Sequence, residues 1–175
     1  MTQQVDGRSG RDDSWRNMRW SDFAARRPQL AAEGRRLLYQ YGVGLAFLAT
    51  TRRDGGPRVH PVCPLLTQSD LFAFLVASPK RRDLRRDARY ALHSFPADQN
   101  EDAFYVTGRA MPVIDEVTVD ILANQFASER GMSAPPADLA SWELFAFQIE
   151  SCLLTITSGH GDPAARHTVW HERSD

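Results

Sequence analysis

Apolar residues follow two different spacings along the chain, and the first of them is helical. We expect a short helix that Ser21 caps and that runs through Ala25, followed by a second that begins at Pro28 and ends at Gly42. The apolar side chains that recur every three to four positions on one face of the second helix are Leu30, Ala31, Leu37, Leu38 and Tyr41.

After Gly42 the apolar residues form short continuous runs that are rich in β-branched and aromatic side chains, a composition typical of strands. Asp54-Gly55-Gly56 lies between the first two runs and supplies the positive-φ residues that a hairpin turn needs. The predicted strands are Val43–Thr51, Pro57–Leu66, Leu71–Ala77, Arg89–Phe95, Ala103–Val113, Leu144–Thr157 and His167–His171.

One longer helix is predicted over residues 116–130, with Asp115 as its cap and Gly131 after its end. Val119, Leu122, Ala123 and Phe126 are spaced to share its buried face. Seven strands joined mostly by hairpin-length loops predict a mainly β fold, with an antiparallel, Greek-key-like sheet curled into a barrel and helices at its periphery.

Composition places this barrel in a single domain over residues 19–175, after a polar arm at residues 1–18 that we expect to be disordered. Hydrophobic residues make up 42% of the chain, and the formal net charge of −1 argues against a general nucleic-acid-binding protein. No apolar run reaches the roughly 18 residues of a membrane span, and no apolar leader begins the chain, so we expect a cytoplasmic protein. Cys63 and Cys152 lie far apart in apolar segments and form no zinc or disulfide pattern.

The segment Ser78–Asp87 carries the strongest chemical signal. Serine followed by proline predicts a helix start directly after a strand, and the free N–H groups of such a start bind anions. Lys80 lies in the first turn, and residues 78–89 hold six cations against two carboxylates. A phosphate site is one interpretation, and a solvated connector anchored by Leu84 is the other.

The segment Arg58–Pro64 contains Pro61 and Pro64 and directly follows Pro57, and none of the three prolines can donate to a strand ladder. The strand must therefore be edge-like or bulged. Exposed backbone groups of this kind suit a flat heterocycle, whereas an ordinary edge strand needs no ligand at all.

The histidines give no metal pattern. His167 and His171 share a strand face but lie about 13 Å apart at roughly 3.3 Å per residue, and His160 lies in a turn. His93 is expected to be a core or rim side chain. No P-loop, no HExxH motif and no Ser-His-Asp order is present, so nothing supports a hydrolase, and Asp83 and Asp87 are expected in exposed charge clusters.

The order of three segments resembles a known family. GVGLAFLATTRRDGGPRVHPVCPL, LFAFLVASPKRRDLRRDARYALHSF and FYVTGRAMPV are similar to segments of the pyridoxamine 5'-phosphate oxidase-like flavin-binding split barrels. The similarity covers residues 20–172. It implies a homodimer of split barrels with two flavins bound between the subunits.

Matched position by position, this resemblance implies a cofactor site. Ser78 and Lys80 would contact the cofactor phosphate, Arg58–Val62 would line the ring and ribityl chain, and Trp170 would approach the ring from the partner subunit. The cofactor-binding residues implied in this way are Thr50, Arg58, Val59, His60, Pro61, Val62, Ser78, Lys80, Arg81 and Trp170.

The chain departs from pyridoxamine-phosphate oxidases at two matched positions. Pro79 stands where an arginine usually precedes the phosphate-binding lysine, and Ala103 stands where they carry a glutamine. These differences argue against vitamin B6 oxidation. The chain is more similar to shorter relatives, some of which use FMN and some the deazaflavin F420.

We therefore expect a flavin-dependent oxidoreductase that acts on a small-molecule substrate, with Arg58, His60 and Arg109 nearest for orienting it. The catalytic residues remain open because the cofactor carries the chemistry. One alternative is an F420-dependent reductase whose anionic tail is attracted by Arg81, Arg82, Arg85 and Arg86. Another is a flavin- or haem-binding protein without turnover.

The strand Leu144–Thr157 bears on oligomeric state. Phe145, Phe147 and Ile149 alternate on one face, while Leu144, Ala146 and Leu154 are expected on the other. With both faces apolar, one needs a cover outside the barrel interior. A two-fold partner is the predicted cover, and the helix over residues 116–130 is the alternative.

Overall fold

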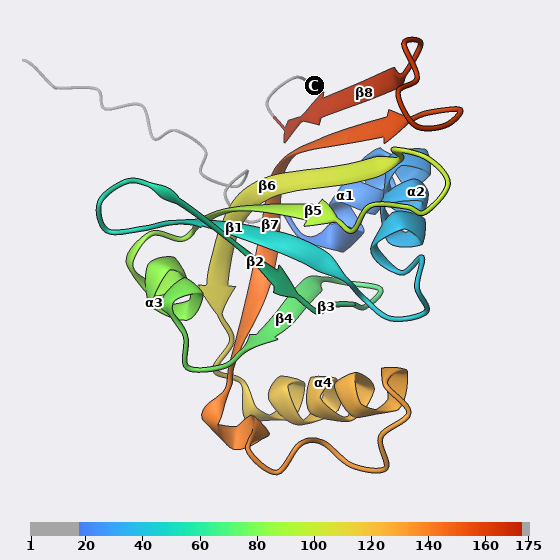
Figure 1. Ribbon diagram of the computed structural model, residues 1–175. Coiled ribbons are helices and arrows are strands. Elements are labelled where there is room, and N and C mark those ends of the chain that lie inside the picture. The colour runs from blue at the N-terminus through green and yellow to red at the C-terminus, as the bar shows by residue number, and fades with distance from the viewer. Residues whose placement is uncertain (1–17, 173–175) are drawn as a thin grey trace, which may run out of the picture.

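Eight antiparallel strands pair into one curled sheet in the computed structural model, which describes residues 18–172 (Figure 1). The order along the sheet is β2-β1-β5-β6-β7-β4-β3, and β8 pairs with β7. This confirms the mainly β, antiparallel barrel fold. The strands are β1 (Ala46–Thr51), β2 (Pro57–Val62), β3 (Pro64–Leu66), β4 (Leu71–Leu75), β5 (Arg89–Ser94), β6 (Ala103–Pro112), β7 (Glu143–Ile156) and β8 (Arg166–His171).

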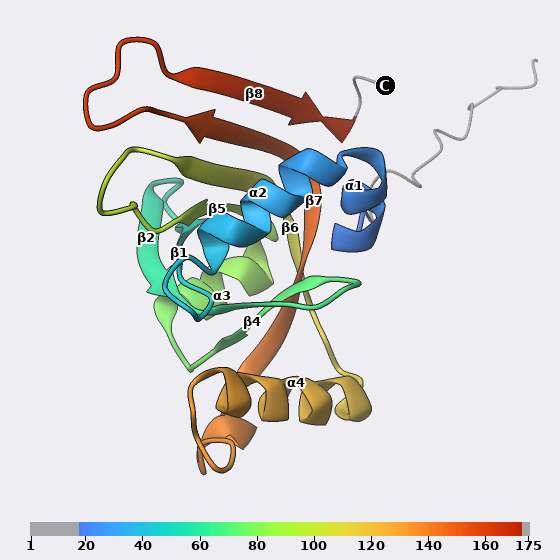
Figure 2. The ribbon, with the colours of Figure 1, turned by 90° about the vertical axis from the view of Figure 1, so that its right-hand side faces the viewer.

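Four α-helices lie around this sheet (Figures 1 and 2). The first two pack against β6 and β7, the third against β1 and the fourth against β3. They are α1 (Trp20–Arg26), α2 (Pro28–Leu38), α3 (Pro79–Arg86) and α4 (Glu116–Glu129), and a short 3₁₀ turn, Leu139–Ser141, precedes β7.

The N-terminal boundary differs slightly from the prediction. The predicted arm, residues 1–18, lies outside the described residues except for Met18. That residue is buried, and its carbonyl accepts a hydrogen bond of 2.9 Å from the N–H of Ile149. Met18 therefore belongs to the core.

Helix α1 begins at Trp20, so the prediction that Ser21 caps it is wrong. The N–H of Ser21 instead bonds the carbonyl of Ser69, while the carboxylate of Asp22 accepts from the N–H of Arg19, the residue before the helix. A side chain beyond the first helical residue cannot cap the helix start.

The predicted strand Pro57–Leu66 is two strands that separate at Cys63. β2 pairs with β1 and β3 pairs with β4, so the two segments occupy opposite ends of the sheet order. Pro61 and Pro64 supply no N–H and flank the break. The edge-like strand that these prolines predicted is confirmed.

The turn between β1 and β2 depends on one positive-φ glycine rather than two. Gly55 has φ of +84°, whereas Gly56 is not among the positive-φ residues. The N–H of Gly56 donates to the carboxylate of Asp54 at 3.0 Å. A Cβ on Gly55 would meet no atom within 4 Å, so only its backbone conformation demands glycine.

Strand β7 is the longest in the sheet and pairs along one edge with two different partners. Its first part pairs with β4 and its second part with β8, while β6 follows nearly its whole other edge (Figure 1). The register with β6 shifts where Gly108 faces Ile149 and Thr107 faces Ser151, so Glu150 is an extra residue on β7. A Cβ on Gly108 would lie 1.9 Å from the carbonyl oxygen of Gln148, a distance that only glycine permits.

This bulge changes which face of β7 is buried in the barrel. Phe145 and Ile149 point into the barrel core before the bulge, and Cys152 and Leu154 do so after it. The prediction that Leu154 lies on the opposite face is therefore wrong, because one inserted residue reverses the alternation.

The opposite face of the first part of β7 is covered within the chain. Leu144 packs in a second cluster with Leu122 and Phe126 of α4, with Ala146 at its border. Figure 2 shows α4 beneath this end of the sheet. The cover of this apolar face is therefore the helix over residues 116–130, which was the alternative to a two-fold partner. The apolar faces of β7 give no separate argument for a partner subunit.

Candidate functional site

The N-terminus of α3 carries a hydroxyl that has no partner. Ser78 holds the cap position with extended backbone angles, φ −150° and ψ 163°, but its side chain makes no cap bond. Its Oγ is buried and has no hydrogen-bond partner within residues 18–172. A buried hydroxyl without a partner costs about 1–3 kcal/mol, so the Ser78 hydroxyl is a candidate donor to a bound group.

Lys80 lies in the first turn of the same helix, two residues after Ser78. Burial lowers the pKa of its ammonium group, and the neighbouring Cys63 thiol opposes this shift when it is ionised. Within the described residues the ammonium forms no hydrogen bond or ion pair. Anions are bound in proteins by cations of this kind beside the free N–H groups of a helix start, so Lys80 is a candidate for such a role.

Thr50 and Arg58 meet on another side of α3, at Asp83. The Nε of Arg58 donates to Oδ2 of Asp83 at 2.7 Å, and the hydroxyl of Thr50 donates to the same oxygen at 3.1 Å. Arg86 donates to Oδ1 at 3.2 Å and also to the carbonyl of Thr51. The carboxylate thereby ties the β1–β2 hairpin to α3.

Asp83 is 4% exposed, so the prediction that it lies in an exposed charge cluster is wrong. Burial alone would raise the pKa of Asp83, but hydrogen bonds from Arg58, Arg86 and Thr50 outweigh it and lower the pKa. One feature of the sequence could have indicated that Asp83 forms an ion pair. Asp83 is the single carboxylate in α3 and lies three residues before Arg86, a spacing that forms ion pairs on a helix.

Arg81 and Arg85 are held on a third side of α3. The Nε of Arg85 lies 2.9 Å from a carboxylate oxygen of Glu143, and Arg81 donates to the carbonyl of Ser141 at 3.0 Å. Arg81 is also 3.7 Å from Glu143. These two arginines anchor α3 to the start of β7.

The residues of β2 do not all face one ligand, because side chains alternate along a strand. Arg58 and Val62 share one face with His60, and Val59 and Pro61 point to the other. Val62 is buried in the barrel core, whereas Val59, His60 and Pro61 are exposed. The feature common to all residues of β2 is the outer backbone edge, which is unpaired within the sheet.

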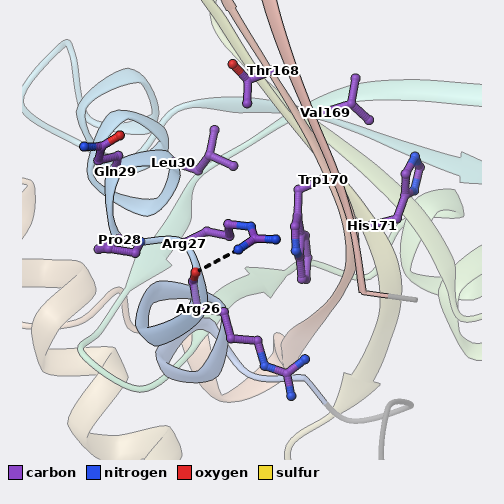
Figure 3. Close-up of a pocket in the computed structure, with 9 residues that line it drawn as sticks. All are labelled: Arg26, Arg27, Pro28, Gln29, Leu30, Thr168, Val169, Trp170 and His171. Atoms are coloured by element: carbon purple, nitrogen blue, oxygen red, sulfur yellow. Dashed lines mark hydrogen bonds between the residues drawn. The ribbon is translucent and has the colours of Figure 1, made fainter. Parts of the chain in front are cut away.

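Trp170 lies near the end of β8, a strand that pairs with β7 and not with β1 or β2, and Figure 3 shows it in the pocket between β8 and the start of α2. It is 4% exposed, and its ring packs 5.1 Å from the ring of Phe23 in α1. Its indole is thus committed to the core of its own chain, on one wall of a pocket of about 410 Å³. The residues that line this pocket are Arg26, Arg27, Pro28, Gln29, Leu30, Thr168, Val169, Trp170 and His171.

The remaining candidates are dispersed. Arg109 is exposed on β6 and pairs in register with Arg89, three strands away from β2. His93 contacts the carbonyl of Ser94 at 2.6 Å, and His167 contacts Thr155. Residues 18–172 contain no group of three or more metal-ligand side chains placed to hold an ion, and no helix among them is long and apolar enough to cross a membrane.

No protein-family model matches the chain, and no curated protein matches it in sequence. Solved structures do match. An F420 reductase is 20% identical, with a TM-score of 0.53 over 62% of this chain and 87% of its own.

Two further structures extend the likeness. A putative pyridoxamine 5'-phosphate oxidase from Listeria innocua is 14% identical, with a TM-score of 0.57 over 70% of this chain and 97% of its own. A heme-binding protein from Mycobacterium smegmatis is 17% identical, with a TM-score of 0.59 over 83% of this chain and 59% of its own. At these identities the likeness concerns the fold, and the chain has the split-barrel fold of the pyridoxamine 5'-phosphate oxidase-like proteins.

Proposed function

We propose that this chain is a flavin-dependent oxidoreductase of the pyridoxamine 5'-phosphate oxidase-like family. It binds FMN and transfers hydride or electrons to or from a small molecule. The observation that carries the proposal is the pair of unpartnered groups at the start of α3, the buried Oγ of Ser78 and the ammonium of Lys80.

A phosphate fits these groups. Its oxygens would accept from the Ser78 hydroxyl and the Lys80 ammonium, and the free N–H groups of α3 would add to this. Three cations occupy the first turn of α3 and none of its residues there is acidic, an arrangement that works against the helix dipole unless an anion is bound. The unsatisfied hydroxyl and the unfavourable charges are both relieved by the same ligand.

The backbone of β2 supports the placement of the ring. Residues 58–62 lie on the edge strand next to α3, with their outer N–H and C=O groups unpaired within the sheet. We propose that these backbone groups hold the ring and ribityl chain, together with the side chains of Thr50 and Arg58, which meet at Asp83. The bound flavin supplies the hydride chemistry, and the chain supplies binding and orientation.

F420 is the second candidate, favoured by the F420 reductase among the similar structures. The phosphate argument is the same for both cofactors, so Ser78 and Lys80 do not separate them. Haem binding without turnover is the third candidate, favoured by the heme-binding protein of the same fold. His171 lines the pocket beside β8 and carries an imidazole of the kind that can ligate haem iron.

We propose that the working form is a cytoplasmic homodimer with a shared cofactor site. The support is the resemblance in fold. The apolar outer face of β7 adds no support, because α4 already covers it. Sedimentation equilibrium at micromolar concentration tests the dimer. A monomer that binds one flavin tightly contradicts it.

An absorption titration tests the cofactor. The purified protein is mixed separately with FMN, F420 and haem. Bound FMN shows two visible bands, bound F420 shows one and haem shows a Soret band. A perturbed FMN spectrum with saturation at one FMN per chain supports the proposal. Saturation by F420 or haem alone favours the corresponding alternative, and no binding of any of the three contradicts all of them.

A further inference from the structure

Helix α4 carries apolar side chains on two opposite sides. On the inner side, Leu122, Ala123 and Phe126 pack in the cluster beneath β7. On the outer side, Val117 is 67% exposed and Ile121 is 62% exposed. Figure 2 shows α4 at the end of the molecule, below the sheet. A helix that is apolar on both sides is usually packed between two partners, and within residues 18–172 the sheet supplies only one of them.

Ile114 adds a third exposed apolar side chain just before this helix. It precedes the cap residue Asp115 and is 92% exposed. An apolar residue at this position often packs against the fourth helical residue, here Val119, but Val119 packs against the inner cluster instead. Spacings of three and four residues join Ile114 to Val117 and Ile121, and we call these three residues the outer stripe.

The charged residues next to the outer stripe in the sequence are all acidic. Asp115, Glu116 and Asp120 are exposed, and residues 110–129 contain no lysine or arginine. The carboxylate of Asp115 caps the helix, whereas those of Glu116 and Asp120 form no hydrogen bond or ion pair within residues 18–172. The helix dipole favours acids at a helix start, but Asp120 lies beyond the first turn. The outer side of α4 therefore combines apolar contact area with unpaired negative charge.

A second copy of α4 fits this surface poorly. In a two-fold contact the same patch lies on both subunits, so the acidic residues of one α4 would face those of the other. Like charges across an interface weaken binding. The same repulsion disfavours the surface of an anionic membrane. Charge complementarity therefore favours a partner whose apolar side chains are flanked by basic ones.

We infer that the outer side of α4 binds a partner protein through a basic amphipathic helix of that partner. The apolar side chains of the partner helix cover the outer stripe, and its lysines or arginines lie near Glu116 and Asp120. Apolar residues at helical spacing are a common means of recognition between proteins, because the side chains of one helix fill the spaces between those of another. The partner surface lies on α4 and the candidate cofactor site on α3 and β2, so neither depends on the other.

Two synthetic helical peptides serve as probes for this surface. Both carry leucine at the same helical spacing, and their remaining positions are lysine in one peptide and glutamate in the other. The fluorescence anisotropy of each labelled peptide, titrated with the full chain, measures its affinity. We expect the lysine peptide to bind about tenfold more tightly than the glutamate peptide, and we expect its affinity to fall as the salt concentration rises.

Substitutions locate the binding on α4. Val117→Ser should weaken binding of the lysine peptide by about tenfold, and Asp120→Asn by about threefold at low salt. Val169→Ser is the matched control, because Val169 is 60% exposed but lies on β8, and it should change the affinity by less than about twofold. Thermal melting verifies that every variant is folded. Val117→Ser should also bind FMN as the parent does, which separates this surface from the candidate cofactor site.

Four results would overturn the inference. The first is failure of the lysine peptide to bind, or equal binding of the two peptides. The second is an equal loss in Val169→Ser, because the contact would then not be specific to α4. The third is a dimer of the parent that Val117→Ser dissociates in sedimentation equilibrium, which would assign the surface to a second copy. The fourth is binding to phosphatidylcholine vesicles that Val117→Ser abolishes, which would assign it to a membrane.

Discussion

The Nε of Arg58 lies 2.7 Å from Oδ2 of Asp83. This contact joins the edge strand β2 to α3, the helix whose N-terminus carries Ser78 and Lys80. Arg58 has side-chain exposure of 26% and Asp83 of 6%, so the pair is screened only weakly by water. Both side chains line the groove between the β1–β2 turn and α3. The contact therefore sets how the β1–β2 hairpin is placed against α3.

Replacement of this carboxylate should destabilise the fold. We expect Asp83→Asn to lower the free energy of unfolding by about 1.5–3 kcal/mol, the range for hydrogen bonds to a charged group. Chemical denaturation measures the loss. Asp120→Asn, on the exposed side of α4, is the control and should stay within about 0.5 kcal/mol of the parent. Equal stability of Asp83→Asn and the parent would mean that solvent replaces the contact without loss.

The same carboxylate should make stability depend on pH in the acid range. Its pKa is lowered in the folded state, so its contribution is complete above the unfolded pKa of about 3.9 and is lost as pH falls through the folded value. The difference in unfolding free energy between the parent and Asp83→Asn should be constant from about pH 5 to pH 7 and should shrink below about pH 4. Urea melts across this range measure it, and a difference that grows on acidification contradicts the assignment.

Lys80→Ala tests the phosphate site directly. We expect weaker FMN binding by about 1.5–3 kcal/mol, because a charge-assisted hydrogen bond is lost, and unchanged binding of riboflavin, which has no phosphate. Fluorescence titration measures both ligands. Lys80→Arg keeps the charge and should recover part of the FMN affinity. If the parent binds riboflavin and FMN equally well, the phosphate does not contact this helix.

The β1–β2 turn should be sensitive at one glycine. Gly55 has φ of +84°, a conformation that costs a residue with a Cβ about 1–2 kcal/mol, so Gly55→Ala should lower the free energy of unfolding by that amount. Gly159→Ala is the control, because Gly159 is also in open space but lacks a positive φ. Thermal melts compare the two. Similar melting temperatures for both variants would show that the turn adopts another geometry in solution.

Neighbouring residues of α4 should respond very differently to truncation. Leu122 is 2% exposed and packs in the cluster beneath β7, whereas Ile121 is 62% exposed. We expect Leu122→Ala to cost about 2–4 kcal/mol and Ile121→Ala less than about 0.5 kcal/mol. Denaturation curves supply the values, and sedimentation of both variants monitors oligomeric state. A large effect of Ile121→Ala on sedimentation would identify the exposed side of α4 as a subunit contact.

Local patterns were enough to predict most of the secondary structure. The helix at Pro79 follows from Ser78-Pro79, and the longest helix follows from Asp115, whose carboxylate accepts from the N–H of Thr118 at 2.8 Å. Alternation of apolar side chains predicted the strands, and the glycine turn predicted the first hairpin. These features depend on residues within a few positions of one another, so the sequence alone determines them.

What the tertiary structure decided depends on which distant segments meet. Asp83 is buried because Arg58, 25 positions earlier, and Thr50, 33 positions earlier, converge on it, and no local pattern reports such a meeting. Leu154 faces the barrel core because the register with β6 shifts at Glu150, and a single inserted residue reverses every later side chain. The sequence by itself determined where most of the strands and helices lie, including the start of α3 at Ser78-Pro79. Only the tertiary structure decided which charges pair, as with Arg58 and Asp83, because ion pairs form across space rather than along the chain.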